Sequence, residues 1–286
     1  MSYELSEVTA QKLLKGIQIP PQPQIMVDVQ METAMPDVSL TNIAAIISKD
    51  IGISGAALKL INSPFFGLRS TITSISQALN LLGVQNIINI INAITLRNAF
   101  SYQQLAEITK IWDDAIDVAN ASAAIAKLTG LASSDEAYTL GLFHDSGIPL
   151  LMEKYDDYMH VLNRAYAEPQ LRVTDIENAA YETNHAVIGY YVAKAWKLPD
   201  YLSLVIADHH KAEPIFADKI DYEPRSKNLL AVLKLAENTC RSHQTLGKVS
   251  IHHEFNRIKK NLLLYIGLSE PDFEDLQAEI RDMHNI

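Results

Sequence analysis

Apolar residues recur at spacings of three and four along most of this chain, and this pattern restricts the fold more than any other sequence feature. The clearest example is the stripe Val84, Ile87, Ile88, Ile91 and Ile94. A period near 3.6 residues is typical of amphipathic helices, whereas half-buried strands alternate with a period of two. The sequence lacks alternating stretches flanked by Asn-Gly or Asp-Gly turns, and only 11 of its 286 residues are glycine. We therefore predict an all-α fold.

Prolines and small polar residues divide this pattern into separate helices. A proline-rich run at 19–23 ends a first predicted helix over 4–16, because proline lacks an amide donor and restricts the residue before it. Ser74 is placed to cap a helix that starts at the next residue. Ser133, with Glu136 three residues later, resembles a capping box at the start of another helix.

The length of the chain fits one large domain or two small ones. The sequence shows no internal repeat, no low-complexity tract and no long linker. We predict two packed helical lobes, an N-terminal one over 1–108 and a C-terminal one over 109–286. We expect the two lobes to belong to one module and not to fold separately.

The charge and cysteine content narrow the partners and the cellular compartment. The 24 basic and 34 acidic residues give a net charge of −10, and no Lys/Arg run is present. An acidic surface repels phosphate backbones, so we expect no nucleic-acid partner. A lone cysteine, Cys240, permits no internal disulfide and suits a reducing cytoplasm. No run of ~18 apolar residues occurs, so we expect no membrane span.

Five residues at predicted helix ends could bind a metal: His144 and Asp145, then His185, then His209 and His210. Imidazole and carboxylate are ordinary ligands of Fe, Mn, Zn and Ni. Each group alone has a simpler explanation, because histidine near a helix C-terminus complements the helix dipole. The order His-Asp, His, His-His is more specific than any one of these groups, and it predicts a divalent transition-metal site.

The sequence resembles the HDOD family, the output-domain relatives of the HD phosphohydrolases. The resemblance covers about residues 18–212 and consists of several stretches in order. They are IPPQPQIMVDV (19–29), ISKD (47–50), LKLINSPFFGLR (58–69), ALNLLG (78–83), GLFHDSGIPLL (141–151), NHAVIGYYVAKAWKLP (184–199) and ADHH (207–210). The resemblance implies a bacterial protein with an HD-like helical bundle in the C-terminal lobe.

The resemblance also places two further ligand positions in this sequence. The early histidine of an intact HD site corresponds to Asp114 in the segment WDDAIDVA (112–119). Asp114 could still bind a metal, but we favour a solvated acid on a helix surface. The late aspartate corresponds to Glu237 in KLAENT (234–239), which is longer by one methylene group.

One departure from the family concerns the reaction itself. The related phosphodiesterases have HDIGK, where this chain has His144-Asp145-Ser146-Gly147-Ile148. The lysine would stabilise the charge of a reacting phosphate, and losing such a donor costs about 10²–10³ in rate. We therefore expect a metal pocket without a cationic group and without efficient hydrolysis.

Three functions remain open at this point. The preferred hypothesis is a signal-transduction module that acts through contacts with signalling proteins and has a degenerate metal site. The alternative is a divergent metal-dependent phosphohydrolase for nucleotides or cyclic dinucleotides. In a third hypothesis the histidines are only structural and no metal binds. Three apolar elements could contact a partner, although we favour burial in the core for each of them: the helix with Ile87 and Ile94, the Phe65-Phe66 turn and the C-terminal helices. Self-association stays open.

Overall fold

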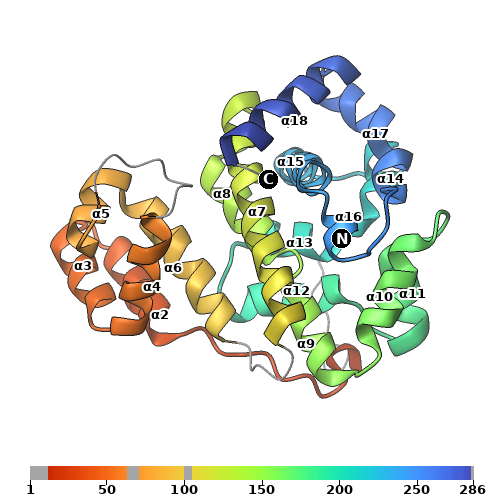
Figure 1. Cartoon of the computed structure of the whole chain (residues 1–286). Coiled ribbons are helices and arrows are strands. Elements are labelled where there is room, and N and C mark those ends of the chain that lie inside the picture. Colours follow the sequence, from red (N-terminus) through yellow and green to blue (C-terminus); the bar gives the residue numbers. More distant parts are fainter. Residues whose placement is uncertain (1–11, 63–70, 100–104, 285–286) are drawn as a thin grey trace. The chain divides into compact units, whose positions relative to one another are not determined.

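The computed structural model describes residues 12–62, 71–99 and 105–284, and every regular element in these ranges is a helix (Figure 1). The predicted all-α fold is confirmed. Most of the predicted helix over 4–16 and the predicted turn at Phe65 and Phe66 lie outside the described residues. In the described ranges, no helix combines the length and the apolar character needed to cross a membrane.

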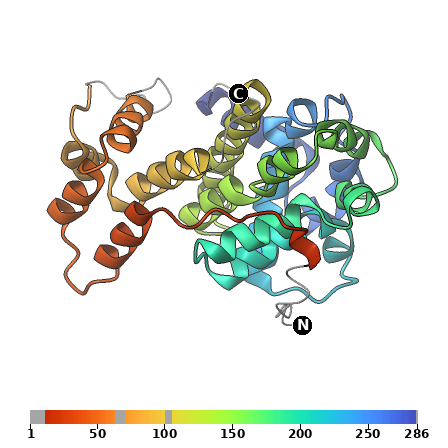
Figure 2. The same cartoon turned by 90° about the horizontal axis from the view of Figure 1, so that it is seen from below.

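The chain divides into two compact units. Among the described residues, the smaller unit comprises 20–62 and 71–99, and the larger comprises 12–19 and 105–284. The segment 12–19 therefore groups with the larger unit, although we predicted one N-terminal lobe over 1–108. Figure 2 shows this segment beside helices of the larger unit, where Lys15 forms an ion pair with Glu182.

The smaller unit is a bundle of short helices around an isoleucine-rich core. Ile43, Ile61, Ile87 and Ile91 are almost completely buried in it, which confirms the predicted core stripe. The predicted cap is also confirmed, because the Ser74 side chain accepts a hydrogen bond from the Gln77 amide. The helices are α2 (Gln24–Thr33), α3 (Leu40–Ser48), α4 (Ile51–Ile61), α5 (Ile75–Leu82) and α6 (Val84–Asn98).

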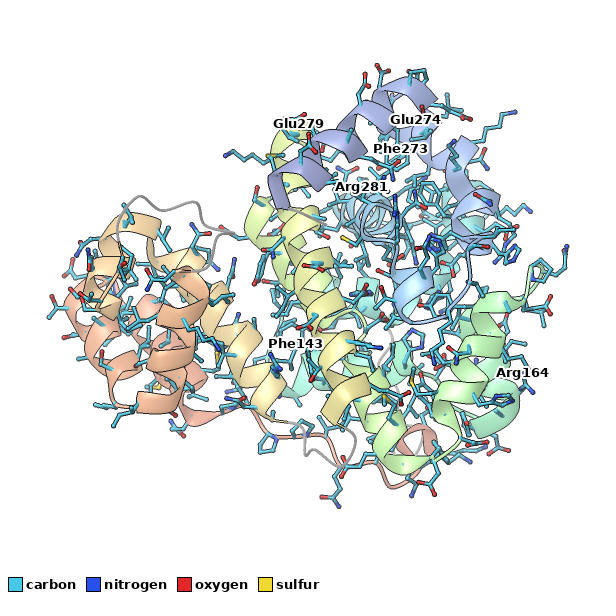
Figure 3. All side chains as sticks on the ribbon, in the orientation of Figure 1. Phe143, Arg164, Phe273, Glu274, Glu279 and Arg281 are labelled. Atoms are coloured by element: carbon cyan, nitrogen blue, oxygen red, sulfur yellow. The ribbon has the colours of Figure 1, made fainter. Side chains whose placement is uncertain are left out.

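The larger unit surrounds a long buried helix, α15, and contains all the candidate ligands (Figure 1). Its helices are α7 (Leu105–Thr129), α8 (Ser134–Phe143), α9 (Gly147–Lys154), α10 (Tyr158–Ala167), α11 (Val173–Tyr181), α12 (His185–Ala195), α13 (Asp200–Asp208), η2 (His209–Lys211), α14 (Ala212–Phe216), α15 (Pro224–Cys240), α16 (Ser242–Thr245), α17 (His253–Ile266) and α18 (Glu270–His284). In Figure 3, Arg281 of α18 points toward α15, and its Nε donates to the Thr239 carbonyl at 3.0 Å.

Two small residues determine how the helices before the site pack. A Cβ atom on Gly141 of α8 would lie 2.7 Å from the Ala119 Cα of α7, so only glycine permits this approach. A Cβ on Gly147, at the start of α9, would lie 2.1 Å from the His185 carbonyl oxygen. Glycine at 147 thus allows the His144-Asp145 corner to lie against the start of α12.

The capping box predicted at Ser133 is wrong, and only the predicted N-cap position is correct. Ser133 occupies the N-cap position of α8, but its side chain makes no capping hydrogen bond. The Glu136 carboxylate instead accepts hydrogen bonds from Arg225 and from the Tyr201 hydroxyl. These partners lie on α15 and α13, so tertiary contacts have replaced the local one.

Candidate metal centre

Helix ends in the larger unit bring the four candidate histidines together. His144 follows Phe143, the last residue of α8 (Figure 3). The centre of the Phe143 ring lies 5.7 Å from that of Trp196. His185 is the first residue of α12, where the Asn184 side chain caps the helix. His209 and His210 form the 3-10 turn after α13. All four imidazoles are at least 95% buried, with exposures of 0–5%.

Three of these imidazoles point their Nε2 atoms at one another. The Nε2 of His185 lies 3.3 Å from that of His209 and 3.0 Å from that of His210. Two nitrogens that bind one ion at ~2.1 Å lie roughly 3.0–3.4 Å apart in octahedral and tetrahedral geometries. These two separations match a shared metal ion and also match N–H···N hydrogen bonds, and the three residues form a candidate ligand group.

The opposite nitrogen of each ring is already engaged. The Nδ1 of His144 lies 2.7 Å from the Gly141 carbonyl, and that of His209 lies 2.7 Å from the Ile206 carbonyl. A carbonyl oxygen only accepts, so both rings donate through Nδ1. When such a ring is neutral, its Nε2 has a lone pair and no proton.

The other two rings are oriented by buried carboxylates that the sequence analysis missed. The His185 Nδ1 donates to Glu177 at 2.7 Å, and the His210 Nδ1 donates to Glu254 at 2.6 Å. Glu177 also accepts the Tyr158 hydroxyl at 2.5 Å. Carboxylates behind histidine ligands fix the tautomer and the ring direction in metal sites. Glu177 and Glu254 lie eight and 44 residues from their histidines, so no local spacing indicated them.

Asp145 lies between His144 on one side and His185 and His209 on the other. Its Oδ2 is 3.1 Å from the His144 Nε2, while its Oδ1 is 3.4 Å from the His185 Nε2 and 3.5 Å from the His209 Nε2. The buried Oδ1 accepts no hydrogen bond. A buried carboxylate oxygen that accepts no hydrogen bond and lies beside imidazole nitrogens is an arrangement that a cation would stabilise.

The two ligand positions inferred from the resemblance lie in the same buried region. Glu237 places its Oε1 3.6 Å from the His144 Nε2. Asp114 is only 5% exposed, so our preferred prediction of a solvated acid is wrong. Its side chain faces Ser242 and interacts electrostatically with Asp145 and His144. Packing of α7 against α15 and α16 buries this face of the helix, which the sequence did not indicate.

A buried cation is also present, which corrects the expected absence of a positive group. Ile148 is a fully buried core residue, as its apolar side chain requires. Lys234 is 1% exposed, and its Nζ lies 2.8 Å from Glu237 and 2.9 Å from Glu254. The cluster thus contains an ammonium group, held between two carboxylates.

Comparison with families of known proteins matches residues 19–212 of the chain to the HDOD domain. This range is more than half of the chain. The chain belongs to the HDOD family. The family predicted from the sequence is confirmed over nearly the residues expected.

Two solved structures share the fold of this HDOD protein. One, from Shewanella amazonensis SB2B, is described as a candidate phosphohydrolase, with a TM-score of 0.70, 21% identity and coverage of 95% of this chain and 94% of that one. The other, from Marinobacter aquaeolei VT8, is described as a candidate signal transduction protein, with a TM-score of 0.68, 17% identity and coverage of 96% and 60%. At these identities the likeness concerns the fold.

A protein of Treponema pallidum (strain Nichols), described as uncharacterized, is 28% identical to the HDOD protein over 193 residues. The match covers 67% of this chain and 37% of that relative. The chain thus corresponds to little more than a third of the relative's length.

Among the buried histidines of this HDOD protein, the pKa of His144 is raised, whereas those of His209 and His210 are lowered. Burial alone would lower the pKa of His144, but Asp145 and Glu237 outweigh it and raise this pKa to about 9. Burial, together with the neighbouring His210, lowers the pKa of His209 to about 3. Burial also lowers the pKa of His210 to about 4, although Glu254 opposes the shift. His209 and His210 are therefore neutral at pH 7 and can bind a metal without first releasing a proton.

We expect a pH titration of the metal-free protein to separate the histidines. Nitrogen chemical shifts in NMR should show His209 and His210 neutral at pH 5.5 and His144 protonated at pH 7.5, as the pKa values of about 3, about 4 and about 9 require. The pKa of His144 is higher than the 6.5 of an ordinary histidine, so its stabilising charge is present below about pH 6.5 and is lost as the pH rises through about 9. The stability difference between wild type and His144→Gln, measured with urea, should therefore shrink between pH 7 and pH 9.5. A neutral His144 at pH 7 would contradict this assignment.

The residues present fit a divalent transition metal. His209 and His210 supply two neutral nitrogen donors, His185 supplies a third when its Nε2 releases its proton, and Asp145 supplies a carboxylate oxygen that accepts no hydrogen bond. Imidazole and carboxylate together suit Fe, Mn, Zn and Ni. The purely structural hypothesis requires a proton on the His185 Nε2, which would then donate to the Nε2 of His209 or His210. Burial would lower the pKa of His185, but Glu177 and Asp145 outweigh it and raise this pKa.

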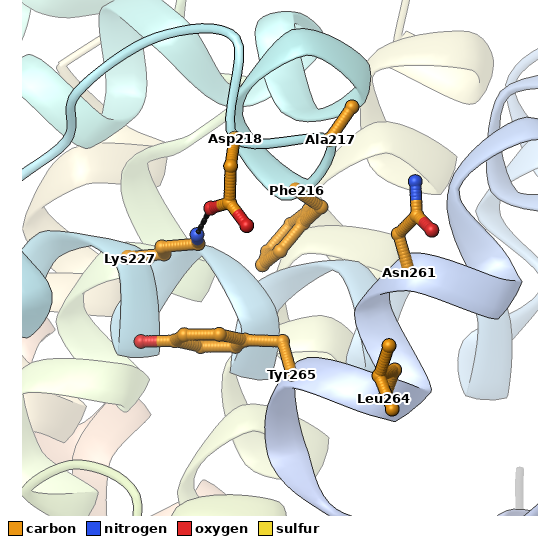
Figure 4. Close-up of a pocket in the computed structure, with 7 residues that line it drawn as sticks. All are labelled: Phe216, Ala217, Asp218, Lys227, Asn261, Leu264 and Tyr265. Atoms are coloured by element: carbon orange, nitrogen blue, oxygen red, sulfur yellow. Dashed lines mark hydrogen bonds and ion pairs between the residues drawn. The ribbon is translucent and has the colours of Figure 1, made fainter.

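A separate surface pocket of about 250 Å³ lies between α14, α15 and α17 (Figure 4). Lys227 forms an ion pair with Asp218 there at 2.6 Å, and its ammonium lies 4.6 Å from the centre of the Tyr265 ring. The residues that line this pocket include no histidine and none of the candidate metal ligands. The basic group of this pocket is thus already compensated.

Proposed function

We propose that this HDOD protein is a signal-transduction module that acts through contacts with other signalling proteins. In this proposal the imidazole cluster holds a divalent transition metal that stabilises the module and does not hydrolyse phosphate esters efficiently. The composition and the single cysteine support a cytoplasmic location, and the family supports a bacterial origin.

The observation that supports this proposal most is the burial of the whole cluster. His144, Asp145, His185, His209 and His210 are each exposed by 5% or less. Structural metal sites are closed by protein ligands, whereas catalytic sites keep a position open for water or substrate. Burial of every candidate ligand therefore favours a structural or regulatory metal.

The position of the ammonium group supports the same function. A phosphate-ester reaction needs a positive group directed at the developing charge. The Lys234 Nζ is instead held by Glu237 and Glu254 at 2.8 Å and 2.9 Å. When bound, the metal would supply a fixed positive charge. His185, His209 and His210 would hold it, and Glu177 and Glu254 would orient the rings of His185 and His210.

A metal-dependent phosphohydrolase for nucleotides or cyclic dinucleotides is the second candidate. The specific observation in its favour is the convergence of three imidazoles, two of which lie within 3.5 Å of Asp145, because a metal held there could activate water. The Shewanella amazonensis protein that shares the fold is described as a candidate phosphohydrolase. The altered positions Asp114, Glu237 and Ile148 argue against efficient turnover.

Metal analysis together with hydrolysis assays distinguishes the two functions. The protein is purified with Fe²⁺, Mn²⁺, Zn²⁺ or Ni²⁺, and cleavage of bis(p-nitrophenyl) phosphate, nucleotides and cyclic dinucleotides is measured. We expect bound metal and a cleavage rate equal to that of the His144→Ala variant. Rapid cleavage that disappears in His144→Ala would refute the non-enzymatic function.

A further inference from the structure

Lys234 is the only buried lysine or arginine among the residues whose burial the structure describes. It lies on α15, three residues before Glu237, so the two side chains share one face of the helix. A buried ammonium group is unfavourable unless nearby acids compensate it. The position of Lys234 beside the candidate metal ligands therefore calls for an explanation that packing alone does not provide.

Lys234 connects the two halves of the cluster through its carboxylate partners. One oxygen of Glu254 binds the Lys234 Nζ, and the other accepts from the His210 Nδ1 at 2.6 Å. Similarly, the Oε2 of Glu237 binds the Lys234 Nζ, while its Oε1 lies 3.6 Å from the His144 Nε2. The ammonium group thus compensates an acid on each side.

The two halves differ in their readiness to bind a metal. In the first half, the nitrogens of His185, His209 and His210 all lie within 4.8 Å of one another. The second half contains His144, the Oδ2 of Asp145 and Glu237. Its atoms do not form such a group within the described part of the chain, and one oxygen of Glu237 is already bound to Lys234.

We propose that Lys234 takes the place of a second metal ion and limits this centre to one divalent ion. The ion would bind at His185, His209, His210 and Asp145, while the ammonium group holds Glu237 away from any metal. This inference rests on the metal site of the proposed function and specifies its stoichiometry. Lys234 is a positioning residue here, because it acts through Glu237 and Glu254.

Electrostatics explains why the ammonium group excludes a second ion. A divalent cation bound to His144 and Glu237 would lie close to the Lys234 charge, and like charges repel strongly where the medium is less polar than water. The second ion would also have to displace the ammonium from Glu237. The charge of Lys234 therefore favours the binding of one metal ion over two.

Native mass spectrometry and elemental analysis of protein equilibrated with Zn²⁺ or Mn²⁺ test this inference. We expect one ion per chain in the wild type and in Lys234→Arg, which keeps the charge. In Lys234→Met, Glu237 and Glu254 lose their cation, and we expect two ions per chain. The double variant Lys234→Met/Glu237→Gln should return to one ion, because the second half then lacks a ligand.

Each other outcome has a defined meaning. Two ions in the wild type, or one in a folded Lys234→Met variant, would overturn this inference and leave the metal site itself intact. No ion in the wild type would overturn the metal site as well. If Lys234→Met does not fold, the Zn²⁺ affinity of Glu237→Gln decides: a change of less than about threefold supports the inference, whereas a loss of about tenfold or more would identify Glu237 as a ligand.

Discussion

Gly147→Ala is expected to destabilise the protein strongly and to weaken its metal binding at the same time. The added Cβ would lie 2.1 Å from the His185 carbonyl oxygen and 2.9 Å from the Gly189 amide nitrogen. Both atoms belong to the backbone of α12, so no side-chain rotation can relieve the overlap. Overpacking of this kind costs about 1–3 kcal/mol, and rigid backbone neighbours place the expected loss at the upper end or beyond. Urea unfolding, monitored by circular dichroism, measures it.

The metal effect follows because the atoms that must move include the backbone of a proposed ligand. Any shift of α12 away from α9 displaces His185 from His209 and His210, so Zn²⁺ affinity should fall together with stability. Gly55→Ala is the matched control, since its Cβ would meet nothing within 4 Å in the helix α4. That substitution should be neutral or stabilising by up to about 1 kcal/mol. A wild-type unfolding midpoint for Gly147→Ala would show that α9 and α12 do not approach as closely as described.

His185→Ala is expected to abolish metal binding at physiological metal concentrations. The His185 Nε2 is the central nitrogen of the group, 3.0 Å from that of His210, 3.3 Å from that of His209 and 3.4 Å from Asp145. Even losing a group that only orients a ligand costs about 10–100-fold in affinity, so losing the ligand should cost more. Isothermal titration with Zn²⁺ or Mn²⁺ measures the affinity directly.

Thermal unfolding of the same variant tests whether added metal stabilises the protein through His185. A metal present at ~100 times its dissociation constant stabilises the folded state by about 2.7 kcal/mol. Added Zn²⁺ should therefore raise the melting temperature of the wild type and leave that of His185→Ala unchanged. His160→Ala is the matched control, because His160 is an exposed histidine on α10 of the same unit. An equal metal-induced shift in wild type and His185→Ala would exclude His185 as a ligand.

The all-α class of this protein was predictable because it depends on local spacing. The stripe from Val84 to Ile94 repeats with the helical period, and its most buried members lie in the core of the smaller unit. Ser74 caps its helix with its own side chain for the same local reason. Ser133 makes no such bond, and the Glu136 carboxylate, which was expected to bond the Ser133 amide, is bound by Arg225 and Tyr201 from distant helices.

The candidate ligands were predictable as residue types but not as a geometry. His144, His185 and His209 stand at helix ends, and the sequence pattern singled them out. Their supporting acids, Glu177 and Glu254, have no spacing that connects them to the histidines they orient. Only the packing of α11 and α17 against the cluster shows these pairs.

The chain's own residue order determined its helices, its HDOD membership and the histidines that can donate to a metal, because these depend on short-range periodicity and on motifs. The tertiary structure alone decided that three imidazoles converge, that Asp114 is buried and that Lys234 lies between Glu237 and Glu254. Burial and charge compensation depend on atoms contributed by helices far apart in the sequence. The cost of burying a charge is therefore decided by partners that no local pattern shows.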